Sequence, residues 1–219
     1  MDYFKEWLRV IDVMDQDNTY KAAWGRAIIE CIVSENYEIV QEKYILHEYE
    51  IVQKLMKYYW NQIAYFQLSQ GPATKIEKQI NSMKQTFLKS KRNKVIHWYD
   101  KVESDLKRNP QVFENIIKKF MTLSSKDFAI KFSHVKRDRI NLYDIDAKLK
   151  QVIFTKNQID SIMHNQDILI DLIHYKWAKV LETYNKSPNI IKKVIGSTKY
   201  RFKTCQTPKQ RNLFIQYYH

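Results

Sequence analysis

Apolar residues recur at intervals of three and four positions along most of the chain, which is the spacing of one face of an α-helix. A helix over residues 2–14, for example, would have one apolar side made of Phe4, Trp7, Leu8, Ile11 and Met14. The same spacing predicts further helices at about residues 19–33, 48–68, 74–90, 95–107, 110–121, 156–164, 166–184 and 188–195. The pattern therefore predicts a mainly α, multi-helix domain.

One part of the chain, residues 128–155, has a shorter period. Phe128, Ile130 and Phe132 alternate with smaller or polar residues, and residues 151–155 form a second apolar run after a turn over 144–150. Alternation of this kind is typical of strands, so we expect a small antiparallel β element at about residues 128–155. Residues 37–46 fit either a short strand or the start of a helix.

The predicted helix over 19–33 contains small residues, Ala22, Ala23 and Gly25, which would let another helix approach closely. Arg26 lies among them, and Glu30 follows one helical turn later. An ion pair between residues four apart on a helix is the simplest interpretation of this arginine.

Composition narrows the class of protein. Hydrophobic residues make up 44% of the 219 residues, which indicates a folded chain, and only three glycines argue against glycine-rich nucleotide-binding loops. Two isolated cysteines, Cys31 and Cys205, predict neither a disulfide framework nor a zinc cluster. The N-terminus does not resemble a signal peptide, and no run is long and apolar enough to span a membrane. We therefore expect a cytoplasmic protein with no membrane partner.

Charge is distributed unevenly along this chain, whose formal net charge is +13. Residues 1–70 contain 7 Lys/Arg and 11 Asp/Glu, whereas residues 71–219 contain 30 and 13. We expect an acidic helical scaffold over 1–70 and a basic region over 71–219, joined in one compact unit. Residues 186–219 hold eight Lys/Arg and no acidic residue. Segregated positive charge of this kind favours a polyanion as partner, above all nucleic acid.

Two parts of the basic region are candidates for phosphate contacts. One is the compact cluster at the end of the helix predicted over 74–90, and the other is the cationic C-terminal segment; a solvated surface is the ordinary alternative for both. The candidate contacts are Lys91, Arg92, Lys94, Lys192, Lys193, Lys199, Arg201 and Lys203. The aromatic run Tyr58-Tyr59-Trp60 could stack on bases, although core packing is the commoner use of such residues.

Complete catalytic motifs are missing from the sequence. It has no glycine-rich phosphate loop, no G-x-S-x-G and no H-E-x-x-H, and its six histidines do not pair at metal-ligand spacing. We therefore predict no catalytic residue, no metal and no cofactor. One carboxylate group leaves an alternative open: Asp144, Asp146 and Lys148, with Asp127 or Asp138 upstream, could form a metal-dependent nuclease site of the PD-(D/E)xK type. These residues fall on a predicted turn, where they are also ordinary turn residues.

Several segments, taken together, resemble the N-terminal helical region of bacterial HNH endonucleases of the restriction or defence type. The segments occur in the same order over nearly the whole chain: Asp17–Trp24 (DNTYKAAW), Lys57–Gln62 (KYYWNQ), Gln67–Gly71 (QLSQG), Leu172–Ala178 (LIHYKWA) and Asn185–Pro188 (NKSP). The resemblance implies a helical domain that precedes a nuclease module.

The HNH module itself is absent, because the sequence lacks its Asp-His pair, its Asn and its final His. No catalytic residue is therefore carried over from the family. The resemblance implies a non-catalytic recognition module for double-stranded DNA, with the nuclease on another chain or in another segment. The alternatives are a protein-interaction subunit of a defence complex and the metal-dependent nuclease through Asp144, Asp146 and Lys148.

Overall fold

The computed structural model describes residues 2–14, 19–71, 74–89, 94–124, 128–135, 138–186 and 190–195. Most of these residues are helical, and a small antiparallel sheet accompanies them, so the predicted fold class is confirmed. The helices are α1 (Tyr3–Asp12), α2 (Tyr20–Val33), α3 (Glu48–Tyr59), the π-helix η2 (Trp60–Tyr65), α4 (Lys75–Lys89), α5 (Tyr99–Lys107), α6 (Pro110–Leu123), α7 (Ala129–Phe132), α8 (Lys156–Tyr184) and α9 (Ile190–Ile195).

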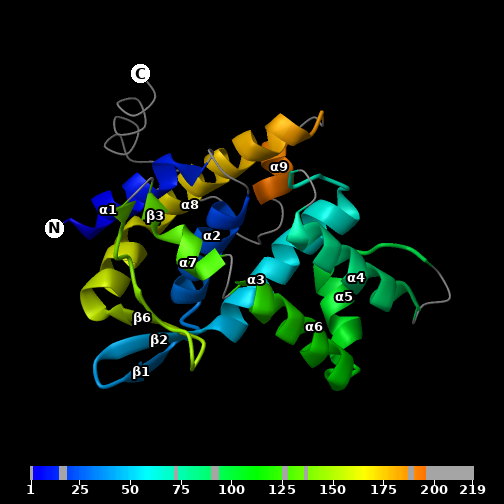
Figure 1. Ribbon diagram of the computed structural model, residues 1–219, viewed down its shortest axis with the longest axis horizontal. Helices are drawn as coiled ribbons and strands as arrows, with labels where there is room; N and C mark the ends of the chain where they lie inside the picture. Colours follow the sequence, from blue (N-terminus) through cyan, green and yellow to red (C-terminus); the bar gives the residue numbers. More distant parts are fainter. Residues whose placement is uncertain are drawn as a thin grey trace.

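The helices form two groups that α3 connects (Figure 1). On one side, α1, α2, α7 and α8 lie together with the sheet, and on the other side lie α4, α5 and α6. Helix α3 packs against α2 in the first group and against α4 and α6 in the second. Among the described residues, no helix combines the length and the apolar character needed to cross a membrane.

Helix α8 is the longest element of the described fold, with 29 residues. Two separate helices were predicted here, but no glycine or proline interrupts residues 156–184, and the structure has one continuous helix. A capping box starts it, in which the Thr155 hydroxyl accepts from the backbone N–H of Gln158 and the Gln158 side chain accepts from that of Thr155. At the other end, Asn185 exchanges hydrogen bonds of 2.8 Å with the backbone N–H and C=O of Ser69.

The sheet has the strand order β1-β2-β6-β5, with every pair antiparallel. Its strands are β1 (Glu38–Val40), β2 (Lys43–His47), β5 (Asp144–Asp146) and β6 (Gln151–Thr155), and a separate two-stranded ribbon consists of β3 (His134–Val135) and β4 (Asp138–Arg139). Because β2 pairs with β6, a segment of the acidic region and a segment of the basic region share one sheet. Residues 37–46, ambiguous in sequence, thus contribute a β-hairpin, whose turn at Gln41 and Glu42 has positive φ angles of 48° and 63°.

The strand predicted at residues 128–133 is wrong, because Ala129–Phe132 is the short helix α7. Aromatic packing explains the difference. Phe128 stacks on Tyr20 with ring centroids 4.4 Å apart, whereas Phe132 contacts Trp7 edge-on at 5.5 Å. A spacing of four residues places both rings on the inner side of one helical turn, where the core holds them.

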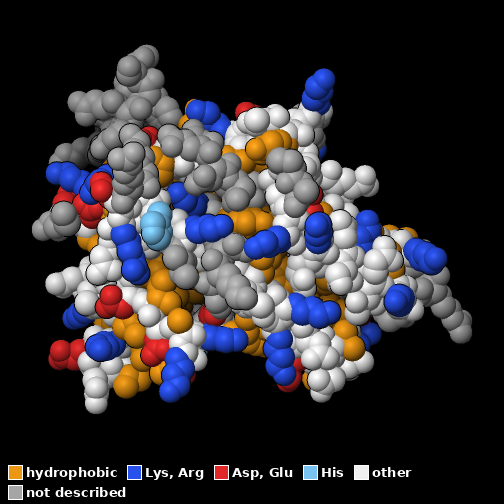
Figure 2. Space-filling model, in the orientation of Figure 1, with side chains coloured by type: hydrophobic (Ala, Val, Ile, Leu, Met, Phe, Trp, Pro, Cys, Tyr) orange, Lys and Arg blue, Asp and Glu red, His pale blue; other side chains and the backbone are white. Residues whose placement is uncertain are grey.

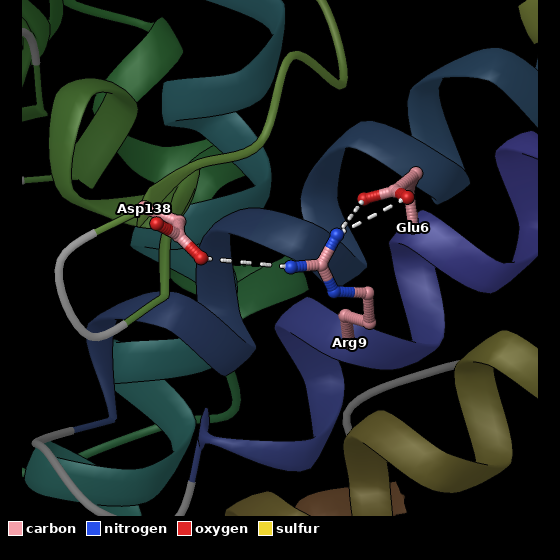
Figure 3. A network of polar contacts seen from close by, with 3 residues as sticks. All are labelled: Glu6, Arg9 and Asp138. Atoms are coloured by element: carbon pink, nitrogen blue, oxygen red, sulfur yellow. Dashed lines mark hydrogen bonds and ion pairs between the residues drawn. The ribbon is translucent and has the colours of Figure 1, made fainter. Parts of the chain in front are cut away.

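Polar contacts at the surface add a link between α1 and the β3–β4 ribbon (Figure 3). Arg9 binds Glu6 at 2.9 Å within α1 and reaches Asp138 on β4 at 3.8 Å. Arg9 and Asp138 are both largely exposed to solvent. Exposed ion pairs contribute about 0–1 kcal/mol, so this network adds little to the free energy of unfolding.

Helix α2 is buried along almost its whole length, and the predicted close approach occurs at Gly25. A Cβ atom added at Gly25 would lie 2.8 Å from Cε2 of Phe132 on α7 and 3.3 Å from Cδ1 of Ile173 on α8. Glycine therefore allows α7 and α8 to pack directly against the backbone of α2.

We expect Gly25→Ala to lower the free energy of unfolding. Alanine would gain about 1 kcal/mol of helix propensity, but overpacking a core typically costs about 1–3 kcal/mol, and the Phe132 ring is itself buried. Urea unfolding followed by circular dichroism measures the difference. Ser104→Ala, at an exposed position of α5, is the control and should change the value by less than about 0.5 kcal/mol. A Gly25→Ala protein as stable as the wild type would contradict this packing.

Candidate nucleic-acid interface

The structure describes the side chains of two of the eight predicted phosphate contacts, Lys94 and Lys193. Lys94 is exposed in the segment between α4 and α5, and Lys193 is half-buried on α9. Lys192 also belongs to α9, but its side chain lies outside the described part of the structure. Outside the described residues altogether are Lys91, Arg92, Lys199, Arg201 and Lys203.

Helix α4 presents a basic face. Lys75, Lys78 and Lys89 are exposed and fall on one side of this helix, because the intervals of three and eleven residues between them are close to whole turns. The opposite side is buried and consists of Ile76, Ile80, Met83 and Phe87. The basic face of α4 is defined here as Lys75, Lys78 and Lys89.

The single acidic residue of α4, Glu77, does not share the basic face. Its carboxylate turns back to the segment before the helix, where it accepts hydrogen bonds from the Ser69 hydroxyl at 3.1 Å and from the backbone N–H of Gln70. The contacts hold the carboxylate at the start of α4. The basic face therefore has positive charge without an acidic residue on the same side of the helix.

The neighbouring helices α5 and α6 differ from α4 in this respect. Most of their basic residues form ion pairs with acidic residues of the same helix, and Arg108, the C-cap residue of α5, pairs with Asp105 of that helix. These pairs are Lys101–Asp105 (3.7 Å), Lys107–Glu103 (3.0 Å), Arg108–Asp105 (3.4 Å) and Lys118–Glu114 (3.9 Å). Figure 2 shows Lys and Arg side chains spread across the middle and right of one face, with few acidic side chains among them.

An aromatic cluster at the end of η2 was not predicted. Tyr65, Phe66 and Trp98 pack edge to face, with ring centroids 5.2–5.6 Å apart. Tyr65 is 45% exposed, and the other two rings are half-buried. Lys193 joins them from α9, with Nζ 5.8 Å from the centroid of the Phe66 ring. These three rings are called the aromatic cluster below.

Two buried side chains near the start of η2 place Trp98 beside Tyr65 and Phe66. The indole N–H of Trp60 donates to the carbonyl of His97 at 2.9 Å, and Asn61 Oδ1 accepts from the backbone N–H of Tyr99 at 2.9 Å. These bonds hold residues 97–99 against the helix on both sides of Trp98. The π-helix is a rare conformation that often occurs at functional sites, and here it ends at the aromatic cluster.

The run Tyr58-Tyr59-Trp60 is not available for base stacking, because all three side chains are fully buried. Tyr58 packs edge-on against Trp177 with centroids 5.8 Å apart, and Trp60 packs against Phe87 at 5.7 Å. The Tyr59 hydroxyl forms a hydrogen bond of 3.2 Å with Thr19. Burial raises the pKa of Tyr58 and of Tyr59 well above the usual value for tyrosine.

The residues of the alternative nuclease site do not assemble into a metal site in the described structure. Asp146 Oδ1 accepts from the backbone N–H groups of Lys148 and Leu149, at 3.0 and 2.8 Å, and so closes the turn after β5. Asp144 is exposed on β5, and Asp138 lies 3.8 Å from Arg9. Asp127 lies outside the described residues, among which no three potential metal ligands gather.

Arg26 forms the predicted ion pair with Glu30, at 2.8 Å, but in the interior of the protein. The arginine side chain is 0% exposed, and its guanidinium lies 4.2 Å from the centroid of the Tyr58 ring. Its Nη1 donates to the carbonyl of Val194 at 3.0 Å, near the end of α9. Arg26 thus joins α2 to α3 and α9. Because both side chains of this pair are buried, the pair stabilises the fold and is not part of a binding site on the surface.

His174 on α8 belongs to the same buried region. Burial lowers its pKa well below the usual value, and the positive charge of Arg26 lowers it further. Neither ring nitrogen of His174 forms a hydrogen bond within the described part of the protein. We therefore expect His174 to remain neutral in the folded state.

No protein-family model, curated protein or solved structure matches this chain.

Replacing Arg26 with methionine should lower the free energy of unfolding by about 3–5 kcal/mol, because Glu30 would be left buried without a counter-charge. The double variant Arg26→Met/Glu30→Leu should recover part of this loss, since it removes both charges. Urea denaturation at neutral pH measures both effects. Arg9→Met, which breaks an exposed ion pair, is the control, with an expected loss of about 1 kcal/mol or less. A double variant no more stable than the single one would show that the unpaired charge of Glu30 is not the cause of the loss.

His174 should make the protein less stable as the pH falls below about 6.5, the usual pKa of an unfolded histidine. Its folded pKa is depressed, so the unfolded chain binds the proton first, and the free energy of unfolding decreases by up to about 1.4 kcal/mol per pH unit. Asp171, whose pKa is raised to about 6, acts with the opposite sign below that pH.

Comparison with a variant therefore isolates the contribution of His174. The stability advantage of the wild type over His174→Gln should be nearly constant between about pH 8 and pH 7.5 and should shrink as the pH is lowered through about 6.5 to about 5, measured by urea denaturation at each pH. A difference that does not depend on pH would show that His174 titrates normally in the folded protein.

Proposed function

We propose that the protein binds nucleic acid, with the basic face of α4 as a principal contact with the phosphate backbone. The observation that carries this proposal is the contrast between α4 and its neighbours. Lys75, Lys78 and Lys89 share one side of α4, and no acidic residue of this helix lies on that side, whereas most basic residues of α5 and α6 have an acidic ion-pair partner within their own helix. A surface that served solubility alone would not require such an arrangement.

The dimensions of the face suit a nucleic-acid strand. At a rise of 1.5 Å per residue, the three lysines span about 21 Å along α4. That distance corresponds to about six nucleotides along B-form DNA, at about 3.4 Å per nucleotide on each strand. Lysine contacts to phosphates release condensed counterions, which supplies affinity without selecting a base sequence. Lys94, exposed in the segment between α4 and α5, adds a further positive charge.

The resemblance to HNH endonucleases suggests a biological setting for this activity. We propose a recognition module for double-stranded DNA in a restriction or defence nuclease, with cleavage supplied by another chain or segment. No residue of this chain is assigned a catalytic role, because Asp146, the best candidate, is engaged with the backbone of its own turn.

A second function, docking of a protein partner, is favoured by the edge of the sheet. Strand β1 is at the edge of the sheet order, and its Ile39 and Val40 are 61% and 47% exposed. The unpaired backbone N–H and C=O groups of an edge strand can form hydrogen bonds with a strand of another chain, and a long apolar edge favours this association. Salt-independent binding of a protein, with no affinity for nucleic acid, would favour this function over the first.

Neutralising the basic face of α4 should weaken DNA binding and reduce its salt dependence. We expect Lys75→Gln/Lys78→Gln/Lys89→Gln to reduce the slope of log K against log salt concentration by roughly one for each phosphate that the variant no longer neutralises. Fluorescence anisotropy with labelled duplex DNA across a salt series measures affinity and slope. The matched control, Lys101→Gln/Lys107→Gln/Lys118→Gln, removes the same charge from α5 and α6, where ion pairs balance it, and should have a much smaller effect.

Two results would contradict the proposal. One is the absence of DNA binding by the wild type at low salt, and the other is an equal loss of affinity in the two triple variants, which would reflect net charge alone.

The same samples, incubated with Mg²⁺ and examined on a gel, test the nuclease alternative. Cleavage that disappears in Asp146→Ala would favour a metal-dependent nuclease.

A further inference from the structure

The aromatic cluster exposes apolar ring surface next to positive charge. Tyr65, 45% exposed, stands almost perpendicular to both Phe66 and Trp98, with interplanar angles of 83° and 87°. In edge-to-face packing the edge of one ring meets the face of the other. The ring surface that stays open to a ligand is therefore the part that solvent reaches, above all on Tyr65. Exposed aromatic groups of this kind are often binding sites, and their chemistry indicates the ligand.

The position of the cluster is fixed before any ligand binds. The hydrogen bonds from Trp60 to His97 and from Tyr99 to Asn61 hold the Trp98 segment, as described above. On the other side, the backbone N–H of Phe66 donates to the carbonyl of Asn61 at 2.9 Å and closes the last π-helical turn. A rigid aromatic surface loses little conformational entropy when a flat ligand stacks on it.

The charges around the cluster favour an anionic ligand. Lys193 holds its ammonium group 5.8 Å from the centre of the Phe66 ring, and Lys94 is exposed four residues before Trp98. The carboxylate closest to Trp98 in the sequence, Asp100, forms an ion pair of 2.8 Å with Lys57. An aromatic surface with cations beside it matches a nucleotide, in which a flat base is attached to a phosphate.

We propose that the aromatic cluster, with Lys193, binds an unpaired base of a nucleic-acid strand and the adjacent phosphate. The inference rests on the proposed nucleic-acid binding and specifies the form of the ligand. In a duplex the faces of each base are covered by its neighbours, so Tyr65 and Trp98 can stack only on a base in a single-stranded stretch or on one that has left the helix. Stacking tolerates every base, so the cluster selects strand state and not sequence.

The experiment compares labelled single-stranded oligodeoxythymidylate with a duplex of equal length, by fluorescence anisotropy at one low salt concentration. Tyr65→Ala should weaken single-strand binding by about five- to 150-fold, which is the range for the loss of one stacked base, and should change duplex binding much less. Tyr65→Phe keeps the ring and should restore the affinity. Tyr49→Ala removes a tyrosine that is 39% exposed at the start of α3, and should leave binding unchanged.

Tryptophan fluorescence provides a second, independent measurement. Four of the five tryptophans, Trp7, Trp24, Trp60 and Trp177, are 0% exposed, and Trp98 is the half-buried fifth. A base that stacks on the cluster should therefore quench the emission of Trp98, and Trp98→Leu should abolish the quenching. This readout does not depend on the size of the affinity change.

The outcomes separate this inference from the proposed function. If the wild type binds neither oligonucleotide, both fail. If duplex binding depends on the basic face of α4 while Tyr65→Ala leaves single-strand binding intact, or weakens binding of both strand forms equally, the aromatic cluster has no stacking role and only the further inference fails. Quenching by a peptide library but not by the oligonucleotide would likewise assign the cluster to a protein partner.

Discussion

A guanidinium held inside the apolar core is the interaction on which the rest of this structure depends. Arg26 is buried only because Glu30 balances its charge at 2.8 Å, Tyr58 covers the face of its guanidinium at 4.2 Å and the Val194 carbonyl accepts a hydrogen bond from its Nη1. Each partner lies on a different turn or helix, so the arginine fixes α2, α3 and α9 relative to one another. A buried charge cannot give up such partners without a large loss of stability.

Buried Arg26 connects the core of the protein to the candidate nucleic-acid interface. The carbonyl that Arg26 holds belongs to Val194, and the neighbouring residue, Lys193, extends to the Phe66 ring. Tyr58, against which the guanidinium packs, lies just before the π-helix that ends at Tyr65. The aromatic cluster is therefore supported by the core on two sides, through α9 and through η2. A rigid support of this kind is what a stacking surface needs to bind without a large entropic cost.

The two proposed contacts with nucleic acid would contribute different physical terms. The basic face of α4 supplies electrostatic attraction that depends on salt and is indifferent to base pairing. The aromatic cluster supplies short-range stacking that requires an unpaired base. A protein with both would hold a duplex through its backbone and distinguish the places where the duplex is open. Such a combination suits a recognition module whose chemistry is carried out by another part of an assembly.

Local patterns in the sequence determined most of the helices, the Arg26–Glu30 pair and the segregation of charge, because each depends on residues within a few positions of one another. The tertiary structure decided the features that depend on distant residues. Residues 128–132 alternate like a strand, but packing of Phe128 and Phe132 against Tyr20 and Trp7 makes part of them a helix. Burial distinguishes Tyr58-Tyr59-Trp60, which serve the core, from Tyr65 and Phe66, which reach the surface. The sequence separates Trp98 from these two rings by more than thirty positions, and only hydrogen bonds from η2 bring it beside them.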